Sequence, residues 1–293
     1  MTISGMPETQ ALQHIQNALA EDVGSGWSDF PGDHSSLACF QPHNVGVAVL
    51  KSKEKGVLAG LDIALAVLRT VDEQITTDVF LQDGTSLVAG QEILRAYGPL
   101  TSLLTAERTL LNYIQRLSGI ATTARKWSQH LEGTQTTLLD TRKTTPGWRL
   151  FEKYAVRIGG VQNHRMGLFD MIMLKDNHID YSGGITPAVR KAQAYLDRHS
   201  VHLPIEIEAR TFQDVQEAVE LPSVQRIMLD NFSPEECVRA VQWIAGRKET
   251  EASGGITEET FLSYARTGVT YISMGALTHS VKNLDLHFKA VSL

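Results

Sequence analysis

The sequence predicts an α/β protein whose larger part is a barrel of β/α units. From residue 136 onward, six short β-rich runs alternate with helical runs, and strands separated by helices pair in parallel rather than as hairpins. Polar residues gather where these runs end, and in a barrel such ends meet at one mouth. A doubly wound sheet is the alternative. Six strands fall short of eight, which indicates an incomplete barrel or further strands that the pattern does not reveal.

Each predicted strand is a short apolar run that ends in polar or glycine residues. The runs are TTLLDT (136–141), DMIMLK (170–175), PIEIEA (204–209), RIMLDN (226–231), ETEASG (249–254) and TYISMG (270–275). Capping residues predict where four of the helices begin. They are Thr186 with Pro187, Thr211 with Asp214, Ser233 with Pro234 and Glu236, and Thr257.

The first part of the chain has a different pattern and predicts a separate α+β domain. Helical stretches are expected near 8–20, 56–71 and 102–117, and strands at 45–51, 77–82 and 92–98. We predict an N-terminal domain over 1–112, a catalytic barrel domain over 113–279, and a return of 280–293 to the first domain. The boundary falls in a helical stretch that we expect to be interrupted near Ser118 and Gly119.

Composition narrows the class of protein. No apolar run approaches the roughly 18 to 20 residues that span a bilayer, and the N-terminus lacks a basic or apolar leader, so a cytoplasmic enzyme is expected. The net charge of −6 argues against nucleic-acid and membrane partners. Cys39 and Cys237 are far apart and are expected to be buried thiols, without a disulfide or a structural metal.

One segment reverses the acidic average. Residues 136–175 hold seven Lys or Arg and three acids, so this segment is basic in an acidic chain. Such a focused charge favours a site for a small anion, although a solvated charged face is the alternative. At the end of the first run, Arg142 and Lys143 enter a loop fixed by Pro146 and Gly147. Arginine offers a planar fork to carboxylate or phosphate, and lysine offers a point charge.

Further cations follow the next turns. His164 and Arg165 come shortly after the pair Gly159-Gly160, which lets backbone approach a ligand, and Lys175 stands at the next strand end. A lone histidine is more often structural, but convergence with the other cations favours a role in binding.

Carboxylates come from the later strands. Glu206 and Glu208 share one strand face by the period of two, and Asp230 ends the following strand. A site with both signs suits a Mg²⁺-pyrophosphate or a developing sugar cation, whereas simple ion pairing with Arg142 or Lys175 is the alternative.

Glycine-containing turns after the last two strands expose backbone N–H groups. Ser253, Gly254 and Gly255 precede a helix, and Ser273 with Gly275 repeats the pattern one unit later. Late loops of a barrel are a frequent place for a phosphate monoester, and a plain turn is the alternative.

Together these segments resemble the quinolinate phosphoribosyltransferase (nicotinate-nucleotide pyrophosphorylase) family over nearly the whole chain. The matching segments, in the family's order, are Glu107-Arg108, Leu111-Asn112, 117–122 (LSGIAT), 141–147 (TRKTTPG), 152–155 (EKYA), 163–165 (NHR), 174–178 (LKDNH), 229–231 (LDN) and 251–256 (EASGGI). Two departures stand out: Val161 replaces a frequent third glycine, and the segment 21–36 is longer than the family's acidic N-terminal pattern.

The resemblance implies a fold and a reaction. The fold is an N-terminal open-faced α/β sandwich followed by an incomplete α/β barrel, in a homodimer whose subunits complete each other's sites. The reaction transfers phosphoribosyl from phosphoribosyl pyrophosphate to quinolinate with decarboxylation. It gives nicotinate mononucleotide, pyrophosphate and CO₂ for NAD biosynthesis, and Mg²⁺ is the implied cofactor.

The resemblance also implies roles by motif position. Quinolinate is expected to contact Arg142, His164, Arg165 and Lys175, with Arg108 reaching in from the neighbouring subunit. Lys143, Glu208 and Asp230 are expected to be catalytic, with Lys143 between the substrates and the two acids near the ribose and the Mg²⁺-pyrophosphate. Ser253, Gly254, Gly255 and Gly275 are expected to cradle the 5′-phosphate of phosphoribosyl pyrophosphate.

Two other functions stay open at this point. A relative from the molybdenum-transport-associated branch of the family would use a different acceptor, but the intact segment 141–147 and the His164-Arg165 pair disfavour it. A non-catalytic barrel that senses an anion is the second alternative. Glu208 and Asp230 weigh against it, because sensing an anion requires no acids.

Overall fold

The computed structural model describes residues 2–3 and 5–291, which form two compact units. The first unit contains the described residues of Met1–Arg125, Leu150–Gly160 and Val281–Leu293, and the second contains Lys126–Arg149 and Val161–Ser280. Helix α4 (Leu100–His130) passes through residues 112 and 113 without a break, so a division there stays a prediction. None of the described helices has the length and apolar character that crossing a membrane requires.

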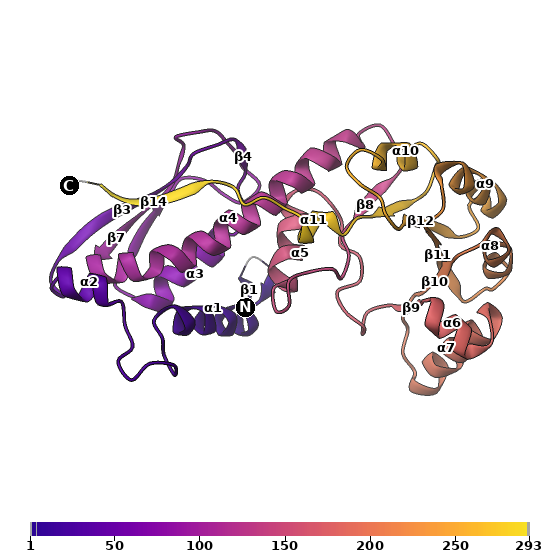
Figure 1. Cartoon of the computed structure of the whole chain (residues 1–293), viewed down its shortest axis with the longest axis horizontal. Coiled ribbons are helices and arrows are strands. Elements are labelled where there is room, and N and C mark those ends of the chain that lie inside the picture. Colours follow the sequence, from indigo (N-terminus) through magenta and orange to yellow (C-terminus); the bar gives the residue numbers. More distant parts are fainter. Residues whose placement is uncertain (1, 4, 292–293) are drawn as a thin grey trace. The chain divides into compact units, whose positions relative to one another are not determined.

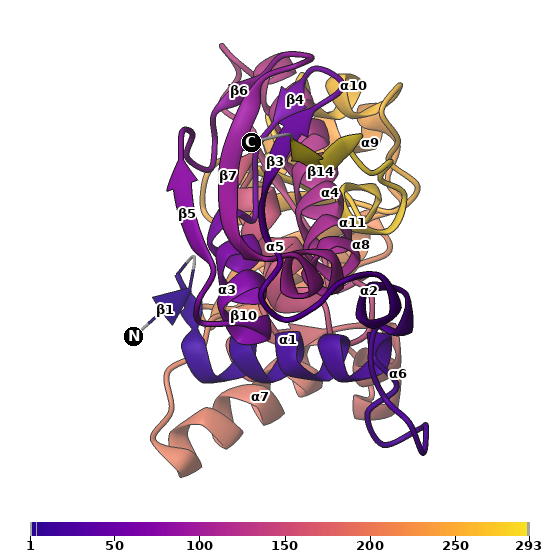
Figure 2. The ribbon, with the colours of Figure 1, turned by 90° about the vertical axis from the view of Figure 1, so that its left-hand side faces the viewer.

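An antiparallel sheet organises the first unit (Figure 2). Its strands lie in the order β14-β3-β7-β5. They span Leu286–Val291, Val45–Ser52, Glu92–Pro99 and Thr76–Val79, in that order. Leu50, Leu94 and Ala96 are fully buried, whereas Glu92 forms partly exposed ion pairs with Lys51 and Arg95. A sheet with one packed face and one polar face fits the open-faced sandwich that the family resemblance implies.

The remaining elements of this unit are helices and short strands. The helices are α1 (Glu8–Asp22), α2 (His34–Cys39), α3 (Leu61–Val71) and most of α4 and α5 (Arg149–Ile158). The short strands are β1 (Thr2–Ile3), β2 (Met6–Pro7), β4 (Gly56–Val57) and β6 (Ser86–Leu87). The helix expected from residue 56 thus begins at Leu61. Cys237 is a buried thiol as expected, but Cys39, in α2, is exposed.

The predicted interruption of α4 near Ser118 is wrong. The Ser118 hydroxyl donates to the carbonyl of Ala59 and accepts its N–H, so this polar side chain serves packing inside a continuous helix. A Cβ at Gly119 would lie only 2.2 Å from the carbonyl oxygen of Lys282. The glycine is therefore explained by the close passage of another segment rather than by a break in the helix.

The second unit contains a six-stranded parallel sheet (Figure 1) in the order β8-β13-β12-β11-β10-β9. The strands are β8 (Thr137–Leu139), β9 (Ile172–Leu174), β10 (Ile205–Ala209), β11 (Val224–Asp230), β12 (Glu249–Ser253) and β13 (Tyr271–Ser273). All six predicted strands are confirmed. Within the described part of the chain, β8 and β9 do not pair with each other, and Leu139 forms only a single bridge with Gln162. The sheet is an incomplete barrel.

Helices follow the strands, and their starts test the predicted caps. They are α6 (Asp176–Ser182), α7 (Ile185–His199), α8 (Phe212–Val219), α9 (Pro234–Ile244), α10 (Phe261–Ala265) and α11 (Ala276–His279). Thr211 and Ser233 form the predicted capping boxes. Thr186 is not a cap, because its hydroxyl and N–H bind Glu217 and α7 begins after Gly184. The prediction for Thr257 is also wrong, because it starts a turn that precedes α10 and Thr260 is the residue before that helix.

Candidate active site

The C-terminal ends of the parallel strands surround one cavity of about 240 Å³ in the second unit. Most of the predicted site residues line it, from β8 around to β13. The lining residues are Thr141, Arg142, Lys143, His164, Arg165, Met173, Lys175, Glu208, Met228, Asp230, Ser253, Gly254 and Ser273. Gly255 and Gly275 do not line the cavity, and Arg108 lies on α4 in the first unit.

The loop after β8 is held by hydrogen bonds on both sides. Asp140 is fully buried and accepts the backbone N–H of His164 at 2.8 Å and the side-chain amide of Asn163 at 2.5 Å. The carbonyl of Lys143 accepts the hydroxyl of Thr278 at 2.8 Å. A Cβ at Gly275 would lie 2.9 Å from Cδ of Lys143. These contacts fix the backbone from which Arg142 and Lys143 enter the cavity.

Two arginines in the cavity are close enough to repel each other. Burial, and then the charge of Arg142, lower the pKa of Arg165. Nη1 of Arg165 donates to the carbonyl of Met171 at 3.2 Å. The buried Nε of Arg142 has no hydrogen-bond acceptor among the described residues. An anion in the cavity would supply acceptors for both guanidinium groups and offset their repulsion.

The acids of the cavity lie on neighbouring strands. Glu208 forms an ion pair with Lys175, with 3.2 Å between Oε1 and Nζ. Burial, and then the negative charge of Glu208, raise the pKa of Asp230, so the two carboxylates are near enough to repel. Oxygen donors in this arrangement suit a hard divalent cation such as Mg²⁺. The cavity therefore has a cationic part, with Arg142 and Arg165, and an acidic part.

Backbone in the left-handed region shapes the rim after β11 and β12. Asn231 has φ of 58° and Gly254 has φ of 94°. A Cβ at Gly254 would lie 2.2 Å from Oδ1 of Asn231, so only glycine fits. The hydroxyl of Ser273 donates to that of Ser253 at 3.1 Å. Gly255 also has positive φ and open space beside it, which leaves room for a ligand at the rim.

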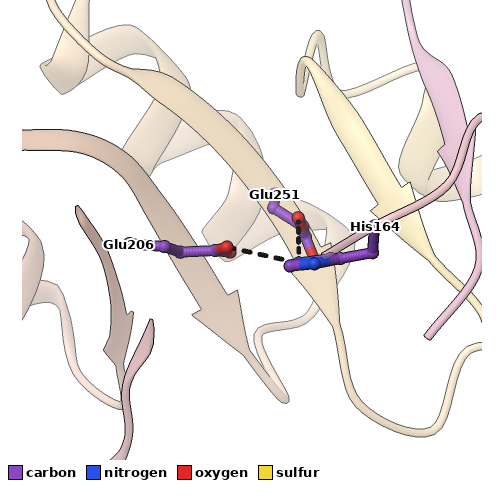
Figure 3. Close-up of side chains that lie close together, drawn as sticks. All are labelled: His164, Glu206 and Glu251. Carbon is purple, nitrogen blue, oxygen red and sulfur yellow. Dashed lines mark ion pairs between the residues drawn. The ribbon is translucent and has the colours of Figure 1, made fainter. Parts of the chain in front are cut away.

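Beneath the cavity lies a buried group of charged side chains that the sequence did not reveal (Figure 3). Nε2 of His164 lies 3.2 Å from Oε2 of Glu206 and 3.3 Å from Oε2 of Glu251. Both acids are fully buried, and they reach the imidazole from β10 and β12. Nη1 of Arg226 donates to Oε2 of Glu251 at 3.0 Å. We call these four residues the His164 network.

The charges of the His164 network balance without a metal ion. Burial would raise the pKa of Glu251, but the hydrogen bond and charge of His164 lower it, so Glu251 is ionised and balances Arg226. Burial and the charge of Glu251 raise the pKa of Glu206. Burial alone would lower the pKa of His164, but hydrogen bonds and charges from both acids raise it to about 9.

The pKa values of His164 and Glu206 are both raised, so these neighbouring groups hold their protons more firmly and titrate together. Nδ1 of His164 lies 2.6 Å from the backbone nitrogen of Arg165, and Nε2 faces the two acids. The donor atoms of His164, Glu206 and Glu251 lie within 4.8 Å of one another. We interpret the group as an ion-pair network because His164 and Arg226 place positive charge beside the two acids.

The sequence analysis selected Glu208 rather than Glu206 as a site residue, and the structure places the two acids differently. The two acids lie on the same face of β10 at different depths: Glu208 lines the cavity, and Glu206 lies under it with His164. The two methionines of the cavity, Met173 and Met228, were also missed. They supply apolar surface beside the cations, and their position on predicted strands next to site residues was the available signal.

Comparisons with known proteins agree over almost the full length. Residues 33–118 match the family model "Quinolinate phosphoribosyl transferase, N-terminal domain", and residues 120–289 match the corresponding C-terminal domain. The chain is 42% identical to the chloroplastic nicotinate-nucleotide pyrophosphorylase (carboxylating) of Oryza sativa subsp. japonica over 94% of this chain and 76% of the relative. It is 40% identical to the probable nicotinate-nucleotide pyrophosphorylase (carboxylating) of Bacillus subtilis, over 96% of this chain and 93% of that relative.

Solved structures give the same result. NadC from Streptococcus pyogenes superposes with a TM-score of 0.90 at 39% identity, covering 98% of this chain and 99% of that one. The nicotinate-nucleotide pyrophosphorylase from Francisella tularensis has a TM-score of 0.90 at 36% identity, with 99% of both chains covered. The chain therefore belongs to the quinolinate phosphoribosyl transferase family.

Proposed function

We propose that this protein transfers phosphoribosyl from phosphoribosyl pyrophosphate to quinolinate, with loss of CO₂, and so forms nicotinate mononucleotide and pyrophosphate. The observation that carries the proposal is the composition of the cavity. Four Lys or Arg side chains, two methionines and two carboxylates line it. An excess of cations beside apolar surface suits a flat aromatic diacid, and adjacent acids suit a sugar that develops positive charge.

The cationic part accounts for quinolinate. Arg142 and Arg165 offer guanidinium forks to carboxylates, Lys175 adds a point charge, and His164 lies at the inner wall. Family resemblance adds Arg108 from a neighbouring subunit, which makes a homodimer part of the proposal. Met173 supplies apolar surface on which the ring can lie.

The acidic part of the cavity and the glycine-containing turns after β12 and β13 account for phosphoribosyl pyrophosphate. Glu208 and Asp230 are placed to bind the ribose hydroxyls and to hold Mg²⁺, which would neutralise charge on the leaving pyrophosphate. Their mutual repulsion in the cavity fits such a cation. Ser253 and Gly254 are proposed to receive the 5′-phosphate, with Gly255 and Gly275 in the neighbouring turns.

Catalysis in this scheme comes from placement. The cations hold the diacid so that its ring nitrogen points at C1′ of the ribose, and Lys143 lies between the two parts of the cavity. As pyrophosphate leaves, positive charge develops at C1′ near Glu208 and Asp230, which stabilise it. The new bond makes the ring nitrogen positive. When the neighbouring carboxylate leaves as CO₂, its bonding electron pair stays on the ring carbon, where the positive nitrogen stabilises it, and that carbon then uses the pair to take up a proton.

The test is a turnover assay with purified protein, Mg²⁺, phosphoribosyl pyrophosphate and either quinolinate or nicotinate. We expect nucleotide and CO₂ in equal amounts from quinolinate, and no nucleotide from nicotinate, because nicotinate lacks one of the two carboxylates that the cations bind. Binding of either substrate without turnover would point to an anion sensor. Turnover of another acceptor alone would contradict the proposal. A cytoplasmic location stays a prediction of the sequence; the rice relative is named as chloroplastic.

A further inference from the structure

The His164 network extends through the interior of the barrel, away from the proposed substrates. His164 lines the cavity at the C-terminal ends of the strands. Glu206 and Arg226 are register partners on β10 and β11, and both also line a second cavity of about 660 Å³, which lies at the N-terminal ends. Arg226 continues the network outward by pairing with Glu249 at 3.2 Å. The charged chain thus reaches from one end of the barrel to the other.

Stability does not explain this network. Burying charged groups costs free energy, and replacing a buried ion-pair group by apolar residues of similar volume is often neutral or stabilising. Glu206 is fully buried, with Nε2 of His164 3.2 Å from its Oε2. A barrel interior is ordinarily filled by branched apolar side chains. Because burying these charges costs free energy, their presence here indicates that they have a function in the cavity above them.

The contacts of His164 indicate how the network can affect the cavity. Its backbone N–H donates to Asp140, which begins the loop of Arg142. Its Nδ1 lies 2.6 Å from the backbone nitrogen of Arg165. The backbone of His164 is therefore joined to the loop of Arg142, and its imidazole is placed between Arg165 on one side and Glu206 and Glu251 on the other.

We propose that Glu206 and Glu251 are positioning residues for quinolinate: they hold the His164 imidazole in place and, through the backbone of that residue, the segments of Arg142 and Arg165 that bind the two carboxylates. This inference rests on the proposed function. It assigns no contact between either acid and a substrate. It follows that both acids govern the affinity for quinolinate rather than the affinity for phosphoribosyl pyrophosphate.

The positions of the two acids on different strands help to separate a local disturbance from an effect on quinolinate binding. Glu206 lies two residues before Glu208, and Glu251 lies two residues before Ser253, so each neighbours a different part of the proposed phosphoribosyl pyrophosphate site. Substituting Glu206 and substituting Glu251 would therefore disturb different parts of the phosphoribosyl pyrophosphate site. The two acids have His164 and Arg226 in common, so an effect on quinolinate that both variants share, and that removal of another partner of Arg226 does not cause, comes through His164.

The test compares Glu206→Gln and Glu251→Gln with the control Glu249→Gln, which removes a half-exposed partner of the same Arg226. Calorimetric titration gives Kd for quinolinate and, with Mg²⁺, for phosphoribosyl pyrophosphate. We expect quinolinate Kd to rise about 10- to 100-fold in both variants, the loss that goes with a misplaced charge-assisted bond. The other Kd should stay within about threefold, and the control should match the wild type in both.

The result that overturns the inference is a quinolinate Kd within threefold of wild type in both variants, or an equal loss for both substrates. If a single variant fails to fold, the charge-balanced pair Glu251→Gln with Arg226→Met takes its place. A double-mutant cycle adds a second readout: in a His164→Asn background, Glu206→Gln should change quinolinate Kd less than twofold, and a full-sized change would refute transmission through His164. A wild-type chain that does not bind quinolinate would refute the proposed function instead.

Discussion

Replacing Arg142 by methionine should move binding and stability in opposite directions. The substitution keeps the apolar stem of the side chain and removes a guanidinium whose buried Nε has no acceptor in the described structure. It also removes the charge that, after burial, lowers the pKa of Arg165. The free protein therefore loses a repulsion, while the complex with a dicarboxylate loses a bond.

The magnitudes follow from those contacts. A hydrogen bond to a charged group contributes about 1.5 to 3 kcal/mol, so Kd for quinolinate should rise about 10- to 150-fold. Relief of the arginine pair should raise the free energy of unfolding by about 0.5 to 1 kcal/mol, as is usual when a strained functional group is removed.

Calorimetric titration with quinolinate and urea unfolding of the free protein measure the two quantities. Arg190→Met is the matched control, because Arg190 is an exposed residue of α7 outside the cavity lining. It makes the same change in net charge and should leave quinolinate Kd unchanged. A quinolinate Kd for Arg142→Met within threefold of the wild-type value would refute the assignment of this arginine.

Three further outcomes follow from the geometry. Gly254→Ala keeps φ at 94° and brings a Cβ to 2.2 Å from Oδ1 of Asn231, so KM for phosphoribosyl pyrophosphate should rise about tenfold or more; a larger change for quinolinate would contradict the phosphate assignment. The raised pKa of His164 stabilises the folded protein below 6.5, and this contribution is lost as pH rises toward 9. The wild type should thus lose up to about 3 kcal/mol more than His164→Asn over that range in urea titrations, and parallel curves would disprove the shift. Gly119→Ala gains about 1 kcal/mol of helix propensity but overlaps the Lys282 carbonyl, so unfolding free energy should fall by about 1 to 2 kcal/mol; a rise would show that the neighbouring segment yields freely.

The sequence predicts the parallel sheet well because each strand carries two signals at once. A β-branched or apolar run such as residues 226–231 gives the strand, and the polar end gives its place at the mouth. Caps were predicted where Thr211 and Ser233 have an acidic partner three residues on. The prediction was wrong for α7, because this helix begins after Gly184, a glycine with positive φ that has no side chain to form a cap.

The sequence pattern did not predict how deep in the barrel each side chain lies. Glu206 and Glu208 are equivalent by the period of two, and only the register between β10 and its neighbours decides that Glu208 lines the cavity and Glu206 meets His164. The last strand was missed for a related reason. Residues 286–291 are short, and their pairing with β3 depends on an element far away in the sequence.

That distant pairing has a consequence for synthesis. β3 is synthesised long before β14, so one side of β3 has no partner strand until β14 has been translated, an interval on the order of tens of seconds. Bare strand sides are templates for aggregation, and Leu286 and Phe288, buried in the finished protein, have no shelter before they dock. Changes that hinder the pairing of β14 with β3 should therefore lower the yield of recombinant protein.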